Sequence, residues 1–119
     1  MRSLRLVLLL ILSIGPAYAA SPSPLQCDVG PINKNYGGSA WLVYSCNDTR
    51  SLVFVSAPGS PASPFVFFAL VGPKDLTLHG EGTGNKQVTD AAYKELSALT
   101  TTDLAALTAQ ARAVTRNVP

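Results

Sequence analysis

Two residues that can do chemistry together stand two positions apart in the second half of the chain. His79 and Glu81 belong to the segment Asp75–Glu81, in which Leu76 and Leu78 alternate with polar residues. Such alternation predicts a half-buried strand, and residues two apart on a strand point to the same face. An imidazole beside a carboxylate can share a zinc ion or act as a base with its orienting group.

A metal site on this strand would need a third ligand. Asp75 lies too far along the same strand to supply it without distortion. A solvated strand face is therefore the favoured interpretation, because polar residues line one face of many antiparallel sheets. His79 and Glu81 are kept as candidates for an alternative function, a small hydrolase or metal-dependent enzyme.

Other catalytic patterns are missing from the sequence. The glycine-rich segment Gly80–Lys86 has neither the Walker spacing nor the dinucleotide-binding spacing. No Gly-x-Ser-x-Gly motif is present, and His79 is the one histidine that could serve as a base. We therefore expect no cofactor, no bound metal and, on balance, no enzymatic activity.

The two cysteines point to an oxidising compartment. Cys27 and Cys46 are too far apart in sequence for a redox-active C-x-x-C pair. In an exported domain two thiols most simply form one structural disulfide. Closing a loop of this length should stabilise the fold by about 3 kcal/mol.

The first 19 residues have the pattern of a cleaved secretory signal. Arg2 and Arg5 precede the apolar run Leu6–Ile14, and Ala17-Tyr18-Ala19 provides small residues at the cleavage site. The run is about half the length of a membrane-spanning helix. We therefore expect export to the periplasm or the exterior, without membrane insertion of the mature chain.

The charge of the mature chain excludes one class of partner. Residues 1–19 hold two of the nine basic side chains and none of the seven acidic ones, so the remaining 100 residues are formally neutral. Nucleic-acid binding needs a surplus of cationic side chains that displace counterions. We therefore expect no nucleic acid as a partner. Asn47 begins an Asn-x-Thr glycosylation sequon, which matters only in a eukaryotic source.

Hydrophobic patterning places four strands before two helices. Strands are predicted at Ser39–Cys46, Leu52–Val55, Phe65–Val71 and Asp75–Glu81, from their aromatic and β-branched content or their alternation. Phe65–Val71 is apolar throughout and is expected to be the most interior strand. Residues 30–38 are rich in Gly, Pro and Asn and are interpreted as loop.

Helical spacing of apolar residues begins near Asp90. Thr89 or Asp90 is expected to cap a first helix, and Thr101 or Thr102 a second one that follows a break. Strands followed by helices predict an α+β fold: about four antiparallel strands with both helices packed on one face. The domain boundaries expected are a signal at 1–19, an irregular segment at 20–38 tied by the disulfide, and a single domain at 39–117.

The leading functional hypothesis is a non-enzymatic exported domain that binds a protein or small ligand, as an inhibitor or accessory subunit. Trp41 and Tyr44 are candidate binding residues, because one face of their strand could form an exposed aromatic patch. Besides the enzyme, a second alternative to this hypothesis is an oligomerising structural component of the envelope, which should have a long unpaired strand edge.

Overall fold

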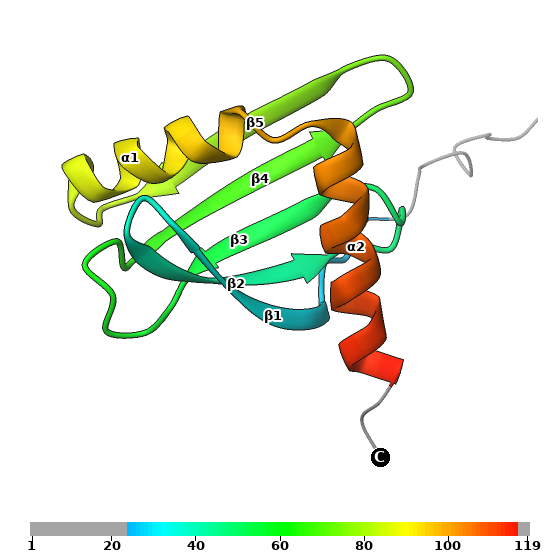
Figure 1. Ribbon diagram of the computed structural model, residues 1–119, viewed down its shortest axis with the longest axis horizontal. Helices are drawn as coiled ribbons and strands as arrows, with labels where there is room; N and C mark the ends of the chain where they lie inside the picture. The colour runs from blue at the N-terminus through cyan, green and yellow to red at the C-terminus, as the bar shows by residue number, and fades with distance from the viewer. Residues whose placement is uncertain (1–23, 117–119) are drawn as a thin grey trace, which may run out of the picture.

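The computed structural model describes residues 24–116, so the predicted signal at 1–19 lies outside the described residues. Five strands form one antiparallel sheet in chain order: β1 (Val29–Tyr36), β2 (Ser39–Ser45), β3 (Leu52–Ser56), β4 (Phe65–Val71) and β5 (Leu76–Gly82). Two helices follow, α1 (Lys86–Ser97) and α2 (Thr101–Arg116), as Figure 1 shows. The predicted α+β fold and the disulfide between Cys27 and Cys46 are confirmed.

The sheet has one strand more than predicted, because β1 occupies most of the segment interpreted as loop. The prediction of an irregular region at 30–38 was wrong for two physical reasons. Pro31 lacks an N–H for the ladder, but β1 is an edge strand with a register shift between Val29 and Ile32, where proline is tolerated. Asn33 and Asn35 are exposed, so the strand is polar along one face.

A two-residue turn joins β1 to β2 and brings α1 close to the sheet. Gly37 and Gly38 have φ of 62° and 77°, between the paired residues Tyr36 and Ser39. Positive φ at both central residues defines a type I′ turn, whose twist matches a hairpin. A Cβ on Gly37 would lie 2.4 Å from the backbone nitrogen of Ala92 in α1, so the turn also requires glycine for close packing.

The most interior strand is β3, and the expectation for Phe65–Val71 was wrong. β3 lies at the centre of the sheet, and four of its five residues are buried. β4 lies next to the edge strand β5 and alternates between buried Phe67 and Ala69 and partly or fully exposed Val66 and Leu70. The apolar run on β4 therefore serves two environments, the core and an uncovered surface.

The helices begin earlier than their apolar spacing suggests. Asn85 caps α1, because its Oδ1 accepts hydrogen bonds from the N–H groups of Gln87 and Val88. Thr100 caps α2 through its Oγ1, which accepts from the N–H of Asp103, while the Asp103 carboxylate accepts from the N–H of Thr100. This reciprocal capping box starts α2. α1 ends at Ser97, with Ala98 as its C-cap, so the predicted break between two helices is confirmed.

Both helices cover the same face of the sheet (Figure 1), and the core lies between them and the strands. Trp41 and Phe54 of the sheet are fully buried there, with Ala92 and Leu96 of α1 and Leu104 of α2. The Trp41 ring packs edge-on against Phe65 and tilted against Phe67, in the geometry that aromatic pairs prefer. Within residues 24–116, the opposite face of the sheet has no helical layer.

Candidate functional site: the outer face of the sheet

The face of the sheet that points away from the helices is apolar at its centre. We call it the outer face. Strand register forms two rows of side chains across β2, β3 and β4, one of Leu42, Val55 and Val66 and the other of Tyr44, Val53 and Phe68. The apolar side chains that share this face are Leu42, Tyr44, Val53, Val55, Val66, Phe68 and Leu70. All but Val53 are partly or fully exposed.

His79 and Glu81 lie on the outer face at its β5 side, as their spacing predicts. Register pairs His79 with Phe68 and Glu81 with Val66. The His79 Nε2 is 3.2 Å from the Glu81 Oε2, and the imidazole stacks near the Phe68 ring with centroids 6.3 Å apart. The pair is therefore joined to the apolar centre of the face and forms part of its rim.

The His79–Glu81 pair is exposed to solvent. Both side chains are 65% exposed, so water solvates the imidazole and the carboxylate. Within residues 24–116, no group of three or more His, Cys, Asp or Glu side chains could hold a metal ion. A hydrolytic or metal centre needs converging polar groups, and the described residues place none beside His79 and Glu81.

The structure separates the two aromatic candidates on β2. Trp41 is fully buried, and its Nε1 donates to the Tyr36 carbonyl at 3.2 Å and to the Ser39 Oγ at 3.0 Å. Its role is to hold the β1–β2 turn and fill the core. Tyr44 lies on the outer face, three residues along the strand. Of the pair, Tyr44 alone can contact a partner.

The aromatic residue Phe68 is the functional candidate that sequence reasoning missed. The signal was present, because the run Phe65–Val71 is apolar at every position. We interpreted it as burial of both faces inside one domain. A second apolar face on a strand whose neighbours are equally apolar can instead be a surface for another molecule.

A shallow hollow of about 320 Å³ extends the outer face at the end of β3 and the start of β4. Val55 and Val66 form its apolar side, Pro64 lies at its margin, and Glu81 contributes the charged group of its lining. Such a hollow beside an apolar centre can receive a side chain of a bound protein.

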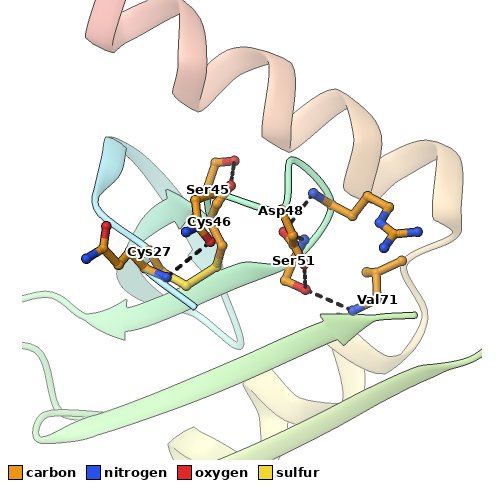
Figure 2. Close-up of a disulfide and its surroundings, with 9 residues drawn as sticks. Cys27, Ser45, Cys46, Asp48, Ser51 and Val71 are labelled. Carbon is orange, nitrogen blue, oxygen red and sulfur yellow. Dashed lines mark hydrogen bonds between the residues drawn. A yellow bond between two sulfur atoms is a disulfide. The ribbon is translucent and has the colours of Figure 1, made fainter. Parts of the chain in front are cut away.

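The disulfide closes the open end of the β1–β2 hairpin, opposite the glycine turn (Figure 2). Cys27 precedes β1 and Cys46 follows β2. Two hydrogen bonds join the neighbouring residues: the Asn47 N–H donates to the Gln26 carbonyl at 2.7 Å, and the Gln26 N–H donates to the Asn47 Oδ1 at 3.2 Å. The sequon asparagine is therefore exposed but already bonded to the chain.

Asp48 organises the turn that follows the disulfide, as Figure 2 shows. Its carboxylate accepts from the N–H groups of Arg50 and Ser51 and from the Ser51 hydroxyl, whose oxygen in turn accepts from the Val71 N–H. Partial burial acts to raise the pKa of Asp48, but the bonds from Ser51 and Arg50 outweigh it and hold the pKa below its usual value. The turn thereby ties β2, β3 and the end of β4 together.

The glycine-rich connector before α1 is engaged within the fold. The N–H groups of Thr83 and Gly84 donate to the Pro64 carbonyl, and that of Asn85 donates to the Pro61 carbonyl. A phosphate-binding loop needs backbone N–H groups that point at the ligand. Here the connector is instead fastened to the proline-rich loop that precedes β4.

Comparison of the chain with protein-family models, with curated proteins and with solved structures finds no match. Among residues 24–116, neither helix has the length and apolar character needed to cross a bilayer.

Proposed function

We propose that this chain is an exported, non-enzymatic domain that binds a partner protein through the outer face of its sheet. The observation that carries the proposal is the apolar centre of that face, formed by residues of β2, β3 and β4 on the side opposite to α1 and α2. Isolated exposed apolar residues are ordinary on proteins, whereas a contiguous patch typically marks an interaction site.

The composition of the face supports a protein as the partner. Tyr44 and Phe68 lie near its centre, on either side of Val53 in register. Its margins are polar, with Asn33 and Asn35 on β1 and the His79–Glu81 pair on β5. An apolar centre with aromatic anchors and a polar rim is the usual anatomy of a protein–protein interface.

The size of the face bears on the strength of binding. Three strands spaced about 4.8 Å apart, over about six residues each, present roughly 300 Å² of apolar surface. That lies at the lower end of the range for the largest apolar patch on a typical soluble monomer, and it is less than the area that each partner contributes to a standard interface. We therefore expect the polar rim on β1 and β5 to contribute to the contact.

Export rests on two independent features. The signal pattern at residues 1–19 predicts passage through a secretory pathway, and the Cys27–Cys46 disulfide is typical of an oxidising compartment. The exposure of His79 and Glu81, without a third converging group among the described residues, supports a binding role over the hydrolase or metal enzyme.

The test compares two variants that differ in the face they change. The purified oxidised chain is immobilised and exposed to the secreted or envelope fraction of its native cell. Phe68→Asp on the outer face should abolish retention of the partner, whereas Ala109→Asp on the exposed side of α2 should not. Equal retention by both variants, or no retained protein with the unmodified chain, would contradict the proposal.

The strand edge favours a second candidate function, an oligomerising envelope component. β5 ends the sheet with seven residues that contain no proline or lysine, and its register with β4 is unbroken. The opposite edge, β1, is protected by Pro31, a register shift and Lys34. Light scattering distinguishes this function: a dimer or larger species that Leu76→Lys dissociates would support it, and a monomer at all concentrations would exclude it.

A further inference from the structure

A second apolar hollow lies on the helix-covered face and is lined by residues of the sheet and of both helices. Figure 1 shows the connection from α1 to α2, which also contributes to the lining through Leu99. The volume of the hollow is about 220 Å³. Phe54 and Ala69 of the sheet form its floor, and Leu96 and Leu104 of the helices form its walls, all of them less than 5% exposed. The exposed lining residues belong to α1 and β5, so the hollow is open to solvent on that side.

The mouth of the hollow has two polar groups and no charged ones. Tyr93 and Leu76 are 46% and 41% exposed at the rim, and Ser97 lies beside them. The Ser97 hydroxyl donates to the Tyr93 carbonyl, so its oxygen keeps lone pairs that can accept a hydrogen bond. None of the lining side chains is Asp, Glu, Lys, Arg or His. A charged ligand would therefore lose its hydration here without gaining an ionic partner.

We propose that this hollow binds a small uncharged molecule with an apolar ring body and a single hydroxyl or N–H group. The lining indicates this chemistry, because the apolar floor and walls suit a ring and the Ser97 hydroxyl oxygen can accept a hydrogen bond from the polar group. The volume sets the size, because an apolar cavity of about 150 Å³ accommodates benzene. A hollow of about 220 Å³ fits a fused two-ring molecule.

This site is independent of the proposed partner surface. Ala69 points to the helices, whereas its neighbours Phe68 and Leu70 share the outer face. The two proposals can therefore fail separately, because variants can change one face of β4 and leave the other intact.

The first experiment titrates the oxidised, isotope-labelled chain with two probes of similar shape, one uncharged and one anionic at neutral pH. We expect 2-naphthol to shift the amide signals of Ala69 and Leu96, and 2-naphthoate to bind at least tenfold more weakly. Equal binding of both probes, shifts centred on Tyr44 and Phe68, or no shift at the solubility limit of 2-naphthol would each overturn the proposal.

The second experiment fills the hollow from two sides. Ala69→Leu extends the floor, and Ser97→Trp covers the mouth from an exposed position that tolerates a large side chain. Each should weaken 2-naphthol binding at least tenfold, while Ala40→Leu, the same change as the first on an exposed position of β2, should leave it unaltered. If Ala69→Leu fails to fold, the test rests on Ser97→Trp. Unchanged 2-naphthol binding by either folded variant would contradict the proposed site.

Discussion

Replacing either glycine of the β1–β2 turn with alanine tests how closely α1 approaches the sheet. Gly37 and Gly38 both have positive φ, so an added Cβ strains the backbone equally at either position. Their surroundings differ. A Cβ on Gly37 would lie 2.4 Å from the Ala92 nitrogen, whereas a Cβ on Gly38 meets nothing within 4 Å. Comparing Gly37→Ala with Gly38→Ala therefore separates the cost of backbone strain from the cost of steric overlap with α1.

The expected costs follow from that difference. The left-handed conformation costs an alanine about 1–2 kcal/mol, so Gly38→Ala should lower the free energy of unfolding by about this amount. Gly37→Ala adds an overlap that shifts the backbone of α1, and forced overpacking costs typically about 1–3 kcal/mol more. We expect Gly37→Ala to lose about 2–5 kcal/mol in total.

Equilibrium unfolding in urea measures both variants against the unmodified chain. With a slope of roughly 1–1.5 kcal/mol per molar urea for a chain of this size, the two midpoints should differ by about 0.7–3 M. Equal midpoints for the two variants would refute the close packing of α1 on the turn. A larger loss of unfolding free energy for Gly38→Ala than for Gly37→Ala would refute the conclusion that Gly37 is the glycine that packs against α1.

Three further changes have expected outcomes. Replacing Cys27 and Cys46 together with alanine should lower the free energy of unfolding by about 3 kcal/mol, measured in urea; a loss below about 1 kcal/mol would contradict a structural role. Because the pKa of Asp48 is lowered by folding, its stabilisation is present above the unfolded value near pH 4 and lost as pH falls through the folded pKa. Asp48→Asn should flatten the acid side of the stability profile, and an unchanged profile would count against the turn network. Burial, followed by the charges of Glu95 and Asp103, raises the pKa of Tyr36. The ultraviolet titration of the unmodified chain minus that of Tyr36→Phe should show a phenol that ionises above pH 10, and the stability it contributes is lost as pH rises through that folded pKa.

The fold was predictable where residue patterns act locally. Alternation at Leu76 and Leu78 located β5, and helical spacing located both helices and the break at Thr100. β1 was not predictable in this way, because Gly30 and Pro31 conceal a strand that needs the bulge and the pairing with β2 to form. Pairing is a tertiary property, and an isolated segment does not display it.

The candidate site also has features that local residue patterns predict and features that depend on the tertiary structure. The proximity of His79 and Glu81 follows from the two-residue period of a strand, and the structure reproduces it at 3.2 Å. Which face the helices cover depends on the whole topology, so the uniform apolar character of β4 could not distinguish a buried face from a binding surface. Phe68 was consequently assigned to the interior, although it lies on the outer face.

Photo-crosslinking inside the native cell tests the proposed binding surface most directly. A benzophenone amino acid is placed at position 68 on the outer face or at position 109 on α2, and the cells are irradiated before lysis. The proposal predicts a discrete crosslinked species of higher mass from position 68 and none from position 109. Crosslinks of equal yield from both positions, or none from position 68, would contradict it.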